Sequence, residues 1–252
     1  MKFTTLILTL AAAACLQFST AAQTNNPPAA VAAAEIHTNT AIIPVSRTGK
    51  AVQRQTQVLQ RAKDNPGDYD VEFIGDSITQ FWETMGKDVW QDYYGQRKAI
   101  NMGVSGDRTQ HVLWRFGQGQ LDGIHAKVAV VMIGTNNSNK EDNTEADILE
   151  GVTAIVNQIR QRQPETKIIL LGIFPRGKTF SVQRGKILQV NQALARLDDG
   201  KNIFYIDIGS QMIENDGSIA ESMMKDALHP GAAGYKLWAQ AIEPKLKELL
   251  GN

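Results

Sequence analysis

Apolar residues along this chain form short dense runs, which alternate with longer segments where apolar residues recur every three or four positions. Short runs bounded by turn residues are typical of buried strands, and the longer periodic segments are typical of amphipathic helices. The predicted strands are residues 71–74, 99–101, 128–133, 167–173 and 203–208. The predicted helices are one running through Phe81, Trp82 and Trp90, one containing residues 112–116, and those at 144–162, 182–197 and 232–250.

This alternation of strands and helices predicts the fold class. Each strand–helix–strand step implies a right-handed crossover between parallel strands, with the helices lying on the two faces of the sheet. We therefore predict an α/β fold, a three-layer α/β/α sandwich around a five-stranded parallel sheet. In such sheets ligands bind outside the carboxyl ends of the strands, so functional residues are expected there.

The first 22 residues carry the pattern of a signal peptide. Lys2 supplies a positive charge, residues 6–14 an apolar run, and residues 19–22 are small, which predicts cleavage after Ala21 or Ala22 and export to the periplasm or the exterior. The apolar run is too short for a stable membrane span. Lipoprotein processing at Cys15 is the weaker alternative, because the usual bulky aliphatic residue three positions earlier is absent.

Beyond the leader we expect one tether and one domain. Residues 23–50 are polar, rich in Pro, Ala and Thr, and lack a periodic apolar face. This composition predicts a tether, part of which lies on the surface of the domain. Residues 51–252 form one domain of roughly 200 residues, enough for a single core. Lys plus Arg equal Asp plus Glu at 26 each, so net charge predicts no attraction to nucleic acid or to an anionic membrane. After the predicted cleavage no cysteine remains, which excludes disulfides and thiolate chemistry.

Four segments contain residues that could take part in catalysis. Three of them follow strands, and one precedes the last helix. Residues 75–79 follow the first strand, 101–107 the second and 134–137 the third, while 226–230 come before the final helix. Because the carboxyl ends of parallel strands meet at one edge of a sheet, these loops are expected to converge. Taken singly, each segment has a structural alternative as an ordinary turn or helix start.

In order and spacing the four segments resemble the conserved blocks of the SGNH (GDSL-like) hydrolase superfamily. More closely they are similar to the catalytic subunits of intracellular platelet-activating-factor acetylhydrolase, including residues 111–115 and 171–177. Asn137 departs from the wider superfamily, where an aspartate is common, and the leader departs from those cytosolic subunits. The resemblance implies a flavodoxin-like fold, ester hydrolysis and no cofactor. The resemblance also suggests a homodimer, although the sequence does not reveal an interface.

The resemblance implies a role for each site residue. Ser77 is the expected nucleophile, His229 its general base, and Asp226 the carboxylate that orients the imidazole. The expected oxyanion donors are the backbone N–H groups of Ser77 and Gly103 and the side-chain amide of Asn136.

Two other readings of the motifs are weaker. Ser105 is the runner-up nucleophile, in a near match to G-x-S-x-G that has Asp107 in place of the last glycine. His37, His111 and His125 are too scattered to predict a metal site.

The sequence thus predicts a secreted serine esterase acting on short acyl, above all acetyl, esters. An acetylated glycan is the leading substrate class, since export is predicted and no basic or membrane-binding surface is evident. A lysophospholipase or platelet-activating-factor-like lipid esterase is the alternative within the enzymes. A catalytically idle binding module with the same fold is the alternative outside them, and the presence of Ser77, Asn136, Asp226 and His229 together argues against it.

Overall fold

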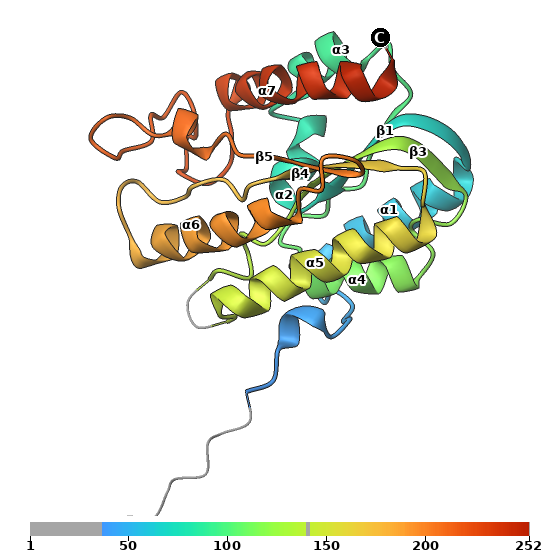
Figure 1. Cartoon of the computed structure of the whole chain (residues 1–252), viewed down its shortest axis with the longest axis horizontal. Coiled ribbons are helices and arrows are strands. Elements are labelled where there is room, and N and C mark those ends of the chain that lie inside the picture. Colours follow the sequence, from blue (N-terminus) through green and yellow to red (C-terminus); the bar gives the residue numbers. More distant parts are fainter. Residues whose placement is uncertain (1–36, 140–141, 252) are drawn as a thin grey trace, which may run out of the picture. The chain divides into compact units, whose positions relative to one another are not determined.

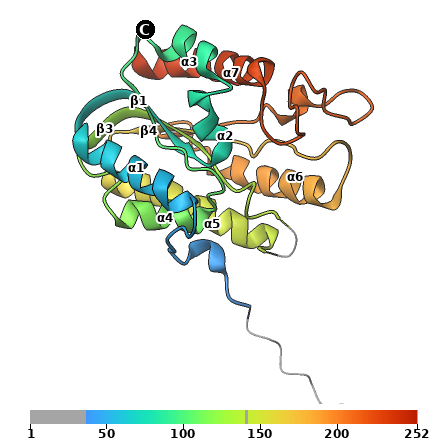
Figure 2. The ribbon, with the colours of Figure 1, turned by 180° about the vertical axis from the view of Figure 1, so that it is seen from behind.

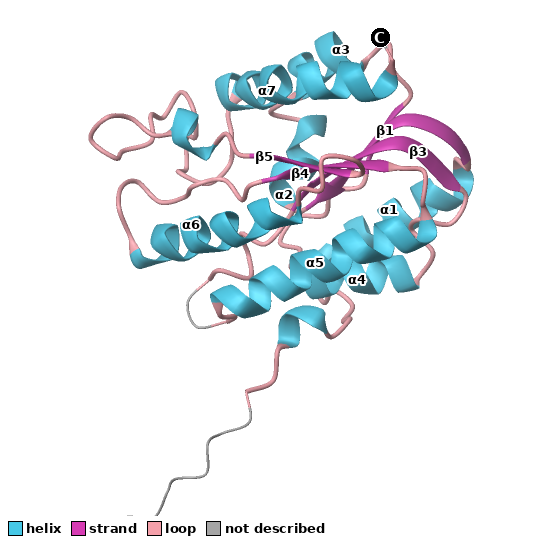
Figure 3. Cartoon of the chain, viewed as in Figure 1, coloured by secondary structure: helices cyan, strands magenta, loops and turns pink. Residues whose placement is uncertain are grey.

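The structure, a computed structural model that describes residues 37–139 and 142–251, contains a five-stranded, fully parallel sheet with helices on both faces (Figures 1 and 3). The strand order is β2-β1-β3-β4-β5. The predicted three-layer, flavodoxin-like fold is confirmed. The strands are β1 (Gly67–Gly75), β2 (Ala99–Asn101), β3 (Ile124–Met132), β4 (Lys167–Leu171) and β5 (Ile203–Ile206).

The helices divide between the two faces of the sheet (Figure 2). One face is covered by α1 (Ala51–Asp64), α4 (Thr109–Gly117), α5 (Glu145–Arg162) and α6 (Val182–Leu194). The other is covered by α3 (Lys87–Tyr94) and α7 (Ala232–Leu250). Shorter turns of helix are α2 (Ser77–Gln80) and the 3-10 segments η1 (Thr40–Ile42), η2 (Phe81–Glu83), η3 (Ala195–Leu197) and η4 (Gly209–Met212).

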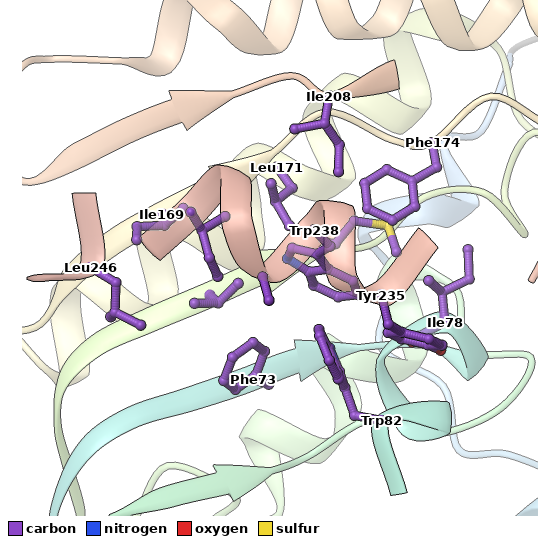
Figure 4. Close-up of a cluster of buried hydrophobic side chains, with 14 of the residues drawn as sticks. Phe73, Ile78, Trp82, Ile169, Leu171, Phe174, Ile208, Tyr235, Trp238 and Leu246 are labelled. Atoms are coloured by element: carbon purple, nitrogen blue, oxygen red, sulfur yellow. The ribbon is translucent and has the colours of Figure 1, made fainter. Parts of the chain in front are cut away.

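Alternation along β1 separates the two halves of the core. Val71 and Phe73 face α3 and α7, whereas Ile74 faces α4 and α5, because successive side chains of a strand point to opposite faces. Most of the buried aromatic rings lie on the α3/α7 face (Figure 4). Trp82 lies 5.0 Å from Trp238 between ring centroids, in a tilted arrangement that buried aromatic pairs favour.

Two elements differ from the sequence prediction. The single helix expected through Trp82 and Trp90 is broken into α2, η2 and α3. At the second break a Cβ on Gly86 would lie 2.7 Å from the Trp82 ring and 2.8 Å from that of Tyr235, so only glycine allows the chain to pass this close. Helix α1 was not predicted, although Val58 and Ala62 form a buried face at helical spacing.

The bounds of α5 agree closely with the prediction, whereas β1 and β3 each begin four residues before their predicted starts. The expected capping arrangement of α5 is present, since Thr144 and Asp147 exchange backbone-to-side-chain hydrogen bonds of 3.1 and 2.9 Å. Within residues 37–139 and 142–251 no helix is long and apolar enough to cross a membrane.

The compact unit that carries the sheet begins at Thr38, so the last part of the predicted tether packs on the domain. We refer to residues 38–47 as the N-terminal strap. Ala41 in it is fully buried, and its carbonyl accepts a 2.8 Å hydrogen bond from the Thr109 hydroxyl. The signal-peptide prediction and Cys15 concern residues outside the described part of the chain.

Candidate active site

Ser77 stands at the carboxyl end of β1, where the chain turns sharply into α2. A Cβ on Gly75 would lie only 2.4 Å from the carbonyl oxygen of Met132, so glycine is needed where β1 ends against β3. Asp76 then caps the helix by accepting a 2.9 Å hydrogen bond from the Ile78 N–H. Ser77 is therefore the first residue of α2, with an N–H that has no intrahelical acceptor.

The structure brings the three residues predicted as a triad into one hydrogen-bonded chain. Ser77 Oγ lies 2.9 Å from His229 Nε2, and His229 Nδ1 lies 2.6 Å from Asp226 Oδ2. Residues 152 positions apart in the sequence thus meet at the carboxyl edge of the sheet. With the Nδ1 proton donated to Asp226, the Nε2 lone pair faces the serine hydroxyl, which is the arrangement that proton removal requires.

The loop that carries His229 is held mainly by its own neighbours. Asp226 Oδ1 accepts hydrogen bonds from the backbone N–H groups of Leu228 (3.1 Å) and His229 (2.7 Å). This tight turn forces Ala227 to a positive φ of 54°, a left-handed conformation that non-glycine residues rarely adopt. The Phe81 ring packs against the imidazole with centroids 4.9 Å apart.

These bonds also set the charge of Asp226. Partial burial by itself would raise the pKa of this carboxyl. Hydrogen bonds from the backbone and ring of His229 outweigh that effect and hold the pKa below its ordinary value. Asp226 is thus ionised and able to stabilise a positive charge on the imidazole, although 56% of its side chain is exposed.

Asn136 follows β3, which pairs directly with β1, the strand that precedes Ser77. The strand order reverses between β1 and β3, and doubly wound sheets bind ligands at such a switch point. Asn136 Nδ2 donates a 2.9 Å hydrogen bond to the Asp107 carbonyl, which ties this half-buried amide to the loop after β2.

The hydrogen bonds of Asn137 explain why this chain has asparagine where an aspartate is common in the superfamily. Its Oδ1 accepts from the Thr109 N–H at 3.0 Å, and its Nδ2 shares its two hydrogens among Thr109 Oγ1, Gln110 Oε1 and Asn143 Oδ1. An aspartate could make the first bond but none of the other three as an ionised group. The buried amide therefore suits this set of neighbours.

The structure does not present Gly103 as the sequence led us to expect. Its N–H donates a 2.8 Å hydrogen bond to Asn101 Oδ1, and it is buried against the backbone of Thr79 and Gln80. That donor is already used, so the predicted oxyanion role of Gly103 is not supported by this geometry. The Asn101 side chain also donates to the Thr79 carbonyl at 2.9 Å and so joins α2 to the loop after β2. This role of Asn101 was not predicted from the sequence.

Gly106, in the same loop, has the properties that Gly103 lacks. It is half-buried, has a φ of +76°, and its N–H has no protein acceptor within the described part of the chain. The neighbouring carbonyl, that of Asp107, is the one bound by Asn136. Ser105, the runner-up nucleophile, uses its N–H on Gln80 Oε1, and the imidazole of His229 bonds to Ser77 instead.

Comparison with known proteins agrees with this geometry. The GDSL-like lipase/acylhydrolase family matches residues 73–237, which include Ser77, Asn136 and His229. The alpha2 subunit of platelet-activating factor acetylhydrolase IB from Rattus norvegicus is 38% identical over 182 residues, covering 72% of this chain and 77% of that subunit. The chain belongs to the GDSL-like lipase/acylhydrolase family. As its relatives indicate, it is an ester-hydrolysing enzyme.

Solved structures share the fold at lower identity. One described as a putative platelet activating factor from Streptococcus pneumonia superposes with a TM-score of 0.66 at 24% identity, covering 77% of this chain and 91% of that chain. A catalytic mutant of an acetylxylan esterase from Geobacillus stearothermophilus superposes with a TM-score of 0.55 at 17% identity, covering 71% and 94%.

Two charged residues beside the triad of this GDSL-like enzyme need separate mention. Asp76 is fully buried, and burial raises its pKa to about 7. Arg176 was not among the predicted site residues. Its guanidinium donates to the Thr135 carbonyl and to Asn139 Oδ1, both at 3.0 Å, and its charge faces Asp76 and Asp226. Among the described residues no group of three or more His, Cys, Asp or Glu side chains could hold a metal ion.

Proposed function

We infer that this enzyme is a secreted serine esterase that removes short acyl groups, above all acetyl, from carbohydrate esters. The observation that carries the chemistry is the hydrogen-bonded chain from Ser77 Oγ to His229 Nε2 and from His229 Nδ1 to Asp226 Oδ2. A serine hydroxyl is a weak nucleophile until a positioned base removes its proton, and the imidazole of His229 is that base.

The proposed reaction has two halves. Ser77 Oγ attacks the ester carbonyl while its proton moves to His229 Nε2, and the ionised Asp226 stabilises the imidazolium. Collapse of the tetrahedral intermediate breaks the bond to the alcohol, which takes the proton from Nε2. A water molecule then attacks the acyl-enzyme with His229 again as base, releasing the acid and restoring the serine.

The oxyanion of each intermediate needs preorganised donors. We assign them to the Ser77 N–H, the Asn136 side-chain amide and the Gly106 N–H, the last in place of Gly103. This assignment is supported by the free Gly106 N–H and by the 2.9 Å bond that holds Asn136 beside the same loop. Removing one such donor typically lowers kcat by about 10²–10³.

The first test measures hydrolysis of p-nitrophenyl acetate, butyrate and octanoate by the purified protein and by Ser77→Ala. We expect turnover that falls with acyl length and is lost in Ser77→Ala. Turnover that persists in the variant would remove Ser77 as nucleophile. No turnover on any ester would favour the binding-module alternative.

A lipid ester is the second candidate substrate, because curated relatives that are 38% and 35% identical carry the name platelet-activating factor acetylhydrolase. We expect a higher kcat/KM on acetylated xylo-oligosaccharides than on platelet-activating factor itself. The reverse ranking would reassign the enzyme to lipids and leave the mechanism unchanged.

Export is part of the proposal and is supported by the signal-peptide pattern of residues 1–22. The mass of the protein recovered from the secreted or periplasmic fraction should correspond to a chain that begins at Ala22 or Gln23. A mature chain beginning with a lipidated Cys15 would contradict this cleavage and would make the enzyme an exported lipoprotein instead.

A further inference from the structure

The N-terminal strap lies against the two loops to which the proposed oxyanion donors belong. Its Val45 N–H donates to the Gln110 carbonyl at 3.2 Å, and Thr109 Oγ1 donates to the Ala41 carbonyl at 2.8 Å. Its Thr40 hydroxyl accepts a 3.0 Å bond from Asn143, which in turn binds Asn137. The strap precedes the segment matched by the family, which begins at residue 73.

Arg47 ends the strap and is held firmly in place. Its backbone N–H donates to Gln55 Oε1 at 2.8 Å, and Gln55 is a buried residue of α1. Its side chain is only 21% exposed, so its contacts are shielded from water more than those of a surface arginine. Its guanidinium donates a 2.8 Å hydrogen bond to the Gly106 carbonyl and lies 3.7 Å from Asp107 Oδ1.

Asp107 connects this guanidinium to Asn136. The Asp107 carboxylate is fully buried and receives two hydrogen bonds from Arg115, of 3.0 and 2.9 Å. Its carbonyl accepts the 2.9 Å bond from Asn136 Nδ2. Arg47 therefore binds Gly106 by a hydrogen bond and lies within ion-pair distance of the Asp107 carboxylate, and one proposed oxyanion donor lies at each end of the Gly106–Asp107 pair.

We propose that Arg47 is a positioning residue for ester hydrolysis, which fixes the Gly106–Asp107 pair so that the Gly106 N–H and the Asn136 amide point together at the oxyanion. The strap is then part of the active-site architecture. This inference rests on the proposed function. Arg47 itself touches no reacting atom; it acts on the transition state through the donors that it orients.

Arg47→Ala in the full chain tests this role. Because small displacements of catalytic groups cost large factors in rate, we expect kcat to fall by about 10- to 100-fold, with KM within about twofold of the unsubstituted enzyme. The affinity for an alkyl boronic acid, which forms a tetrahedral anionic adduct on the serine, should fall by a similar factor. A purely structural arginine would leave both the kcat of folded molecules and that affinity unchanged.

Two further variants give the test its controls. Arg47→Lys keeps the positive charge near Asp107 but loses the planar guanidinium that donates to the Gly106 carbonyl, so its kcat should lie between those of the Ala variant and the unsubstituted enzyme. It also carries the test where Arg47→Ala does not fold. Arg97→Ala removes a similarly shielded arginine, 13% exposed and paired with Glu243 of α7, and should lower stability while leaving kcat unchanged.

The outcomes separate this inference from the proposed function. Loss of activity in Ser77→Ala together with an Arg47→Ala kcat within twofold of the unsubstituted enzyme would overturn the role of Arg47 alone. Equal kcat losses in Arg47→Ala and Arg97→Ala would also overturn it. Restoration of the Arg47→Ala activity by added guanidinium ion, at concentrations that do not unfold the protein, would support it.

Discussion

The two faces of the sheet hold the candidate active site in different ways. On the α3/α7 face the core contains most of the buried aromatic rings, and the loop carrying Asp226 and His229 is fixed chiefly by hydrogen bonds among neighbouring residues. On the α1/α4/α5 face the core is aliphatic but includes buried ionisable groups, among them Glu72 and the Asp107–Arg115 pair.

This difference teaches which substitutions should separate chemistry from stability. A loop organised by its own short sequence can lose a functional group while the fold stays intact. The oxyanion side depends on bonds between distant residues, such as the one joining Arg47 and Gly106 across 59 positions, so function and folding are coupled there. The three predictions below test this contrast, from the largest expected effect to the smallest.

Asp226→Asn should give the largest effect on activity. An amide in place of the carboxylate no longer stabilises the imidazolium and favours the wrong tautomer of His229, so kcat should fall by about 10⁴-fold. Because 56% of the Asp226 side chain is exposed, the urea midpoint should change little. The measurements are kcat on p-nitrophenyl acetate and urea denaturation.

Asp216→Asn is the matched control. Asp216 is another exposed acid that accepts a backbone N–H within a tight turn, here that of Ser218 at 2.9 Å. Its variant should keep full activity. A drop of less than tenfold in Asp226→Asn, or a large loss of stability, would break the contrast between the two faces.

Glu72, buried on the α1/α4/α5 face, should make the free energy of unfolding of the protein depend on pH. It is fully buried, and burial raises its pKa from 4.5 to about 8, against a smaller opposing effect of the Gln163 side chain. Between those values the folded chain holds a proton that the unfolded chain has lost. The free energy of unfolding therefore decreases as pH rises through this window.

Glu72→Gln removes that dependence. By urea denaturation it should match the unsubstituted enzyme near pH 4.5 and exceed its unfolding free energy by about 3–5 kcal/mol at pH 9. Asp70→Asn, on the same strand, is the control. The Lys127 hydrogen bond holds the pKa of Asp70 below its ordinary value, so the effect of that substitution should not grow between the two pH values. A pH-independent difference for Glu72→Gln would show that the carboxyl is ionised in the fold.

The sequence was sufficient for the features that depend on local patterns. Apolar runs predicted all five strands, and the pattern of Thr144 and Asp147 predicted the start of α5. The break at Gly86 was missed because its cause is the approach of Tyr235, which periodicity within the segment cannot reveal.

The active site was predictable in part, where its residues follow from the order of the strands. The strand-end rule brought Ser77, Asn136 and His229 to one edge, as the structure has them. The role predicted for Gly103 is not supported by the geometry, because a glycine in a loop does not reveal where its N–H points; that depends on the Asn101 side chain. The strap and Arg47 gave no local signal, since their partners lie in distant segments.

Ala227→Gly should give the smallest effect, and it tests the triad loop on its own. Ala227 has a φ of 54°, where glycine avoids a Cβ penalty of roughly 1 kcal/mol, partly offset by the greater freedom of glycine in the unfolded chain. We expect the melting temperature to rise by up to about 2 °C with kcat unchanged, because the Asp226 bonds to Leu228 and His229 are kept. Ala154→Gly, within α5 at ordinary helical angles, should instead lower it. A fall in kcat for Ala227→Gly would mean that the alanine restrains the His229 loop beyond its hydrogen bonds, so the strained turn would itself contribute to catalysis.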